Sequence, residues 1–152
     1  MLPKNHALFG FILSLAALSL FPSWVDLAGA AIIFFSSFLI DFDHYLYYIY
    51  KNRNFDPVRA YNWFRKKGEE LFKLPKEERK KYFVAPYIFH GLEWVLLFIL
   101  LGLFVSSYFI FIAVGMVIHL VLDWIAALKE YGRFLKFSVI VDLVNERSLK
   151  QI

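Results

Sequence analysis

Two long stretches of this chain contain no lysine or arginine. The first lies between Lys4 and Lys51, and the second lies between Lys81 and Lys129. Each stretch is about 46 residues long, which is enough for two apolar helices of about 20 residues and a turn. Hydrophobic residues make up 60% of the chain, above the roughly 45–50% that is usual for soluble domains. The pattern predicts an integral membrane protein.

The charged residues and the missing cysteines exclude several other classes of protein. The chain has no cysteine, which rules out disulfides, thiolate metal sites and a cysteine nucleophile. The net charge is +4, and eleven of the seventeen basic residues fall within residues 51–81. Basic residues packed beside membrane spans are what the positive-inside rule predicts, so we expect membrane topology, and no nucleic-acid partner, to explain the charge.

The expected fold is an all-α integral membrane protein with one domain of 152 residues. We predict four transmembrane helices in an antiparallel bundle with a cytoplasmic helical connector. The predicted spans are about 6–21, 25–48, 84–101 and 107–128. The basic connector covers residues 49–82, and residues 129–152 form a cytoplasmic or interfacial tail. Both termini are then cytoplasmic, in the inner or plasma membrane.

Three local patterns refine this expectation. The start, "MLPKNHALFGFILSLAALSLF", resembles a signal peptide, but a second apolar run follows directly, so we expect a retained first span. In the connector, Asp56 and Pro57 resemble the N-cap and first residue of an amphipathic helix reaching about Lys67. "LPKEERKKYF" at 74–83 suggests a second short helix, and the tail pattern fits either an interfacial helix or a short hairpin.

All four histidines fall near the same predicted side of the membrane, and carboxylates accompany three of them. The histidines are at positions 6, 44, 90 and 119: His6, His44, His90 and His119. The neighbouring carboxylates are Asp41, Asp43, Glu93 and Asp123. On a helix, spacings of three and four place two side chains on one face, so we expect His90 with Glu93 and His119 with Asp123 to form such pairs.

Four carboxylates at one membrane edge need a balancing positive charge, and neither lysine-free stretch supplies one. Either repulsion protonates some of the carboxylates, or a bound cation supplies the charge, and imidazole with carboxylate suits zinc, manganese or iron. Within "DFDH", Asp41 and His44 share a face of a continuous helix, whereas Asp43 points about 200° away from Asp41. The sequence therefore predicts either a break in the helix at this point or an aspartate that orients a ligand imidazole.

Simpler interpretations exist for several of these residues. His6 alone could be a contact with lipid headgroups, and Glu93 could pair with Arg53 or Arg59 of the connector. We expect Asp26 to lie in the N-cap region of the second span. The tryptophans and the tyrosine run at 45–50 fit an interfacial aromatic belt. These interpretations account for single residues and not for the whole set.

The order of the motifs resembles the family of membrane-bound metal-dependent hydrolases, also called LexA-binding, inner-membrane-associated putative hydrolases. The matching pieces are the early histidine of "NHALFG", the Asp-x-Asp-His at 41–44, the central "FHGLEW" and the final His-x-x-x-Asp at 119–123. The likeness covers roughly residues 5–125. It departs from the family at Ile40, where proline is usual, and in having one central histidine, His90, where two with an arginine are common.

The resemblance implies a hydrolase distantly similar to zinc-dependent phospholipase C and single-strand nucleases, which cleave phosphodiesters at clustered zinc ions. We predict a divalent metal, most simply one to three zinc ions, that activates a water molecule against a phosphoester of an anionic, lipid-like substrate. Glu93 is the predicted general base and Asp43 the predicted orienting carboxylate. The predicted metal ligands are His6, Asp41, His44, His90, His119 and Asp123.

Two other classes of function remain open. A metal-ion transporter or channel could use the same cluster as a binding station, although the outer halves of the spans offer few polar residues beyond serines and Asp26. A non-catalytic membrane scaffold could use the metal only to lock the bundle.

Overall fold

The computed structural model describes residues 3–79, 81–85, 88–132, 137–141 and 150–151. The described part is mostly helical, as the sequence predicts. Its helices are α1 (Pro3–Leu20), α2 (Leu27–Leu39), α3 (Phe42–Asn52), α4 (Pro57–Phe72), α5 (Lys76–Arg79), α6 (Leu92–Phe104) and α7 (Tyr108–Tyr131). Two short strands, β1 (Tyr82–Phe83) and β2 (Lys150–Gln151), complete it.

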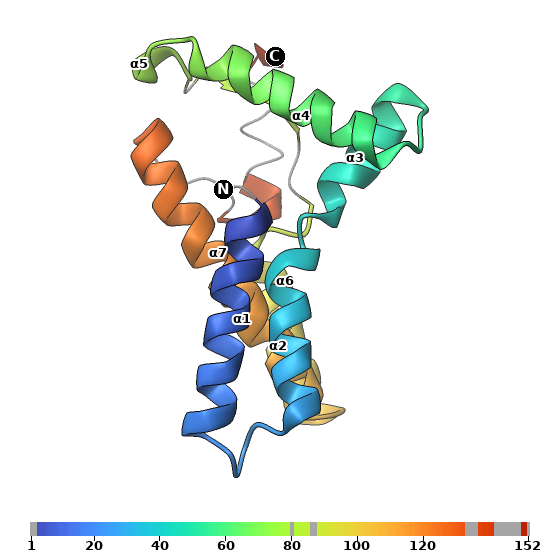
Figure 1. Ribbon diagram of the computed structural model, residues 1–152, viewed down its shortest axis with the longest axis vertical. Coiled ribbons are helices and arrows are strands. Elements are labelled where there is room, and N and C mark those ends of the chain that lie inside the picture. The colour runs from blue at the N-terminus through green and yellow to red at the C-terminus, as the bar shows by residue number, and fades with distance from the viewer. Residues whose placement is uncertain (1–2, 80, 86–87, 133–136, 142–149, 152) are drawn as a thin grey trace.

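Four helices, α1, α2, α6 and α7, extend along the long axis of the molecule (Figure 1). Helix α2 packs against α1 on one side and against α7 on the other, and α6 packs against α7. Helix α4 lies across the long axis, beyond the end at which α1 begins (Figure 1). The four lengthwise helices thus form one body, and the connector covers one end of it.

The second predicted span, 25–48, is not one helix. Helix α2 ends at Leu39, a turn follows at Ile40 and Asp41, and α3 begins at Phe42. In this turn the Asp41 amide donates to the Phe38 carbonyl (3.3 Å), so the Ser37 carbonyl loses its usual helical donor. The break at "DFDH", one of the two alternatives that the sequence leaves open, is confirmed.

The third predicted span, 84–101, begins later than expected. Helix α6 starts at Leu92, after an extended Gly91 with φ −100° and ψ 151°. His90 therefore precedes the helix, and the prediction that His90 and Glu93 share a helix face is wrong. The backbone amide of Leu92 donates to the Phe137 carbonyl (3.1 Å), which ties the start of α6 to the chain after α7.

The connector contains the two predicted helices. Asp56 caps α4 by accepting from the amides of Val58 (2.8 Å) and Arg59 (3.2 Å), with Pro57 in the first turn. Helix α4 continues past the expected Lys67 to Phe72, and α5 is the second short helix.

Only part of the tail is described. Its described end, β2, pairs in parallel with β1 of the connector. Residues 133–136 and 142–149, on which much of the tail prediction falls, lie outside the described residues.

Two glycines let α1 and α7 approach α2 closely. A methyl group on Gly115 would lie 2.5 Å from the Ile33 carbonyl oxygen, and one on Gly10 would lie 2.8 Å from the Ser37 Cβ. Gly10 is one helical turn after His6, and Gly115 is one turn before His119. The close approach therefore brings these two histidines toward the same end of α2.

Two helical stretches are long and apolar enough to cross a membrane, namely Leu27–Asn52, which includes the α2–α3 break, and Tyr108–Tyr131. Only 33% of each apolar window is buried inside the molecule. Helices α1 and α6 are apolar but shorter.

Candidate metal centre

Six side chains from five parts of the fold meet at the end of the helical body near the connector. His6 comes from α1, Asp41 from the α2–α3 break, His90 from the segment before α6, and His119 and Asp123 from α7. His44 joins from the first turns of α3. Segments from the start, the middle and the end of the described chain thus contribute to one cluster, which the sequence predicts.

The ring of His119 is oriented by the break in α2. Its Nδ1 lies 2.9 Å from the Ser37 carbonyl oxygen, the oxygen that the break leaves without its helical donor. Because a carbonyl oxygen only accepts, Nδ1 carries a proton, and Nε2 on the far side of the ring faces the cluster. The imidazole is fully buried, so this orientation is fixed by protein contacts.

The ring of His90 is oriented in the same way by Asp43. Its Nδ1 lies 2.9 Å from Asp43 Oδ2, which also accepts from the Phe89 amide (3.1 Å). A carboxylate that accepts from Nδ1–H turns Nε2 toward the cluster, as in the carboxylate–histidine pairs that support metal ligands. Asp43 therefore lies where the orienting carboxylate of the sequence prediction should lie.

The Nε2 atoms of the two oriented rings face each other. His90 Nε2 and His119 Nε2 are 3.0 Å apart. Asp41 Oδ1 lies 3.3 Å from the first nitrogen and 3.7 Å from the second, and Asp123 Oδ2 lies 3.7 Å and 3.3 Å from them. Four acceptors this close repel one another unless a proton or a cation lies between them.

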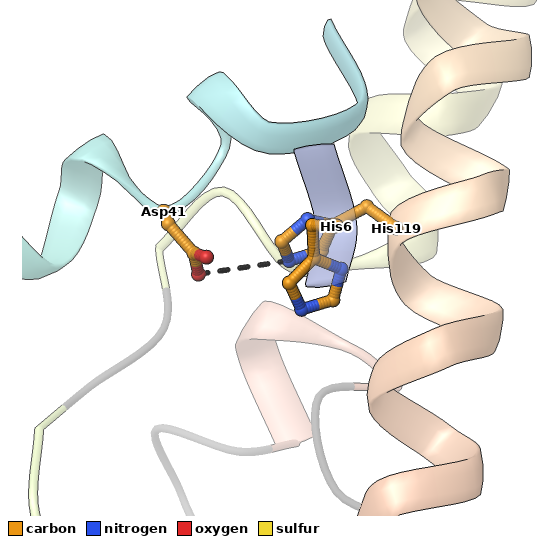
Figure 2. A group of neighbouring side chains, drawn as sticks. All are labelled: His6, Asp41 and His119. Carbon is orange, nitrogen blue, oxygen red and sulfur yellow. Dashed lines mark ion pairs between the residues drawn. The ribbon is translucent and has the colours of Figure 1, made fainter. Parts of the chain in front are cut away.

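His6 extends the cluster toward α1. Its ring stacks on that of His119 with 4.0 Å between centroids, and its Nε2 lies 3.2 Å from Asp123 Oδ1. Figure 2 shows the stacked rings with Asp41 facing them from the α2–α3 break. The His6 side chain is fully buried, and its Nδ1 has no hydrogen-bond partner among the described residues. A buried polar atom without a partner is costly, and a cation ligated here would remove that cost.

His44 and Asp41 form the open edge of the cluster. The His44 Nδ1 lies 2.5 Å from Asp43 Oδ1 and 3.8 Å from Asp41 Oδ1. The two side chains are 23% and 17% exposed, whereas the rest of the cluster is buried. On the connector side, the Phe64 ring of α4 packs against His44 with 5.4 Å between centroids. This edge is therefore the most exposed part of the cluster.

Three sets of ligand atoms are close enough to hold a metal ion, each with its atoms within 4.8 Å of one another. The sets are His6–Asp41–His119, Asp41–His44–His90 and His90–His119–Asp123. Together they contain all six predicted ligands, and Asp41, His90 and His119 each belong to two sets. The buried histidine and aspartate groups can thus hold a metal ion.

Glu93 is not brought into this cluster. The Ser138 hydroxyl donates to its Oε1, and the Val139 amide donates to its Oε2 at 3.2 Å.

Two groups that contact the cluster are not predicted from the sequence, namely the Ser37 carbonyl, which orients His119, and Phe64, which packs on His44. A backbone acceptor has no signature of its own in the sequence, and only the position of the α2–α3 break indicates it.

Asp26 behaves as expected of an N-cap. Its Oδ1 accepts from the Gly29 amide at 2.6 Å, and its Oδ2 accepts from the Tyr108 hydroxyl at 3.0 Å. It caps α2 and links the starts of α2 and α7.

No protein-family model, curated protein or solved structure matches this chain.

Proposed function

We propose that this protein is a membrane-embedded, metal-dependent hydrolase that cleaves a phosphoester bond in a lipid or lipid-like substrate. The observation that carries the proposal is that the Nε2 atoms of His90 and His119 lie 3.0 Å apart between two carboxylates. A cation at the centre of these atoms would relieve their mutual repulsion, and imidazole with carboxylate suits such an ion.

Membrane embedding is supported by polar side chains in the interior and apolar side chains on the outside of the helices. The described interior holds fully or almost fully buried His6, Asp43, His90, His119 and Asp123. The outside of α1, α6 and α7 instead exposes large apolar side chains, among them Phe11, Leu15, Leu97, Leu103 and Ile125. A soluble protein of this size rarely exposes a continuous apolar surface, whereas a lipid-facing one must.

We further infer that α1, α2, α6 and α7 each cross the membrane, with neighbours along the chain antiparallel. The turns after α1 and α6 are short, which suits antiparallel neighbours. The basic connector then marks the cytoplasmic side, and both chain ends lie on that side. The metal cluster lies at the cytoplasmic end of the bundle, next to the connector.

Zinc is the metal that this proposal names. Neutral imidazole and carboxylate ligands without sulfur are typical of catalytic zinc sites. When bound, the ion would supply a nucleophile near neutral pH by lowering the pKa of a bound water molecule. The chain's own residues orient the ligands: Asp43 holds His90, the Ser37 carbonyl holds His119, and Asp123 contacts both His6 and His119.

The position of the cluster supports a lipid-like substrate. Its open edge at Asp41 and His44 is bordered by Phe64, and the surrounding helices are apolar on the outside. A lipid phosphoester, which already lies at the membrane interface, reaches such an edge by lateral movement. The resemblance to membrane-bound hydrolases in the order of motifs agrees with this substrate class.

A transport function has less support. The serines that would have to line a polar path donate their hydroxyls to helix carbonyls instead: Ser14 to Phe11, Ser36 to Ile32 and Ser37 to Phe34. These hydroxyls satisfy helix backbone and are not arranged as an ion path.

Metal content and hydrolysis test the proposal together. We expect the purified protein to contain zinc by elemental analysis and to hydrolyse a phosphodiester such as phosphatidylglycerol. A chelator should abolish turnover, and added zinc should restore it. His119→Gln should lose metal and activity, whereas Ser23→Ala, in the exposed turn after α1, should keep both.

The variants also separate the rival interpretations. Protein without metal would contradict the metal centre, and metal without turnover on lipid or generic phosphodiesters would contradict the hydrolase. If His119→Gln fails to fold, the metal only holds the bundle together. Glu93→Gln tests the predicted general base: lost turnover with retained metal supports that role, and full turnover excludes it.

A further inference from the structure

The rest of the protein covers only part of the apolar surface of helix α4. Its covered side contains Ala60 and Leu71, which are 4% and 2% exposed, and Phe64, which packs on His44. These three residues follow one another at helical spacing, so they form one stripe along the helix. This stripe fixes α4 over the open edge of the metal cluster.

A second stripe, apolar except for Arg65, lies beside the first and is largely exposed, although the Arg79 guanidinium lies over the Phe72 ring with 5.0 Å to the centroid and Arg65 pairs with Glu69 at 3.7 Å. Val58, Tyr61 and Phe72 are 66%, 56% and 44% exposed. Together with Arg65 and Gly68 they follow a 3-4-3-4 spacing, which places them on one helix face. A methyl group on Gly68 would meet nothing within 4 Å, so the middle of this face is open as well. We call these five positions the outer stripe of α4.

The orientation and charge of α4 indicate what covers the outer stripe. The helix lies across the ends of α1, α2 and α7, which is the direction of a membrane surface if those helices cross the bilayer (Figure 1). The segment 51–81 carries eleven basic and five acidic residues, so its net charge is positive. An apolar stripe on a positively charged helix in the membrane plane is typical of helices that bind anionic lipid surfaces.

We propose that the outer stripe of α4 lies at the boundary between headgroups and acyl chains of an anionic phospholipid leaflet. Val58, Tyr61 and Phe72 insert among the upper acyl carbons, and the Arg65 guanidinium contacts phosphate. This inference rests on the membrane placement proposed above, but not on hydrolase activity. Because Phe64 of the same helix contacts His44, the lipid surface also fixes the aromatic side chain that borders the metal cluster.

The absence of cysteine makes a direct test possible. Single cysteines replace Val58 and Phe72 in the full chain, which is labelled with an environment-sensitive fluorophore and reconstituted in vesicles of phosphatidylcholine with phosphatidylglycerol. Lys66→Cys, on the polar face of α4, is the matched control, and Leu97→Cys, 41% exposed on α6, reports the membrane placement itself. Brominated phospholipids quench labels within the bilayer, and aqueous iodide quenches labels in water.

We expect labels at positions 58 and 72 to emit at shorter wavelength, to be quenched by brominated lipid and to be protected from iodide. The label at position 66 should show the opposite pattern. Replacing phosphatidylglycerol by phosphatidylcholine, or raising the salt concentration, should reduce lipid quenching at positions 58 and 72 but not at position 97.

The outcomes distinguish this inference from the membrane placement. Iodide quenching at 58 and 72 with lipid quenching at 97 would overturn the inference and leave the placement intact. Iodide quenching at all three would overturn both. Protection from iodide without lipid quenching would mean that another protein chain covers the stripe, and equal lipid quenching in neutral vesicles would overturn the role of anionic lipid.

Discussion

The orientation of the His90 and His119 rings depends on hydrogen-bond acceptors outside the set of six predicted ligands. Asp43 and the Ser37 carbonyl each hold an Nδ1–H, at 2.9 Å in both cases. These contacts determine which nitrogen of each ring faces the cluster. The metal-binding capacity of the site is therefore set as much by the two orienting groups as by the ligands themselves.

Asp43→Asn should weaken metal binding without removing a ligand. Asparagine keeps one accepting oxygen where Asp43 uses two, one toward His44 and one toward His90. We expect a loss of metal affinity of about 10–100-fold, as for other groups that orient ligand histidines. Competition with a fluorescent zinc chelator measures it. Asp123→Asn, which alters a predicted ligand, should lose more, and unchanged affinity in Asp43→Asn would contradict the orienting role.

Asp26 should stabilise the opposite end of the bundle in a pH-dependent way. The Gly29 amide, with the Tyr108 hydroxyl, holds the pKa of the Asp26 carboxyl below its ordinary value. A lowered folded-state pKa means that this stabilisation is complete above the unfolded-state pKa and is lost as pH falls through the folded-state value.

Asp26→Ala should consequently lower Tm at neutral pH, and the difference from the natural chain should shrink as the pH falls below about 4. Thermal unfolding in detergent across this range measures the difference. Tyr108→Phe, which removes one of the two contacts, should have a smaller effect in the same direction. A difference that is constant with pH would contradict the assignment.

At the scale of elements, the sequence predicts the four apolar segments, the helices of the connector and a possible break at "DFDH", but not where α6 begins. Apolar runs and the Asp56–Pro57 pair are local signals. The start of α6 is not, because the extended Gly91 depends on contacts with Phe137 and Val139 far along the chain. For this reason the expected pairing of His90 with Glu93 fails, whereas His119 and Asp123, within the uninterrupted α7, lie on one face.

The six predicted ligands meet because their positions follow from topology rather than from local detail. Placing each histidine at the same end of its segment requires only the order and length of the apolar runs. The orienting contacts are different: the Ser37 carbonyl becomes available only through the break after Leu39. Similarly, the pairing of Lys150 with Tyr82 joins distant segments without a pattern that would indicate it.

The contact between α2 and α7 should be sensitive to a single methyl group. In Gly115→Ala the new Cβ would lie 2.5 Å from the Ile33 carbonyl oxygen, so the helices must separate. We expect a cost of about 1–3 kcal/mol, together with weaker metal binding because His119 moves with α7. Gly68→Ala, whose Cβ meets nothing within 4 Å, is the control and should stabilise by about 0.5–1 kcal/mol. Equal stability of the two variants would contradict the close packing.

For the whole molecule, the proposed topology makes a prediction about labelling. Single cysteines at Ser23 and Ser107 lie in the turns after α1 and α6, and one at Lys66 lies in the connector. In intact cells, an impermeant maleimide should label the first two from outside and the third only after permeabilisation. Labelling of positions 23 and 107 from opposite sides would exclude four membrane crossings.

The two shortest lengthwise helices have a consequence for how a substrate meets the protein. Helices α2 and α6 have 13 residues each, and are therefore only about 20 Å long, against a hydrocarbon layer of roughly 30 Å. If the outer end of each helix lies at the outer membrane surface, Asp41 and His90 at the inner ends lie several ångströms below the inner membrane surface. A phospholipid could then reach the cluster without leaving its leaflet. Local thinning of the bilayer around the protein would place the glycerol-phosphate linkage at the depth of the predicted ligands.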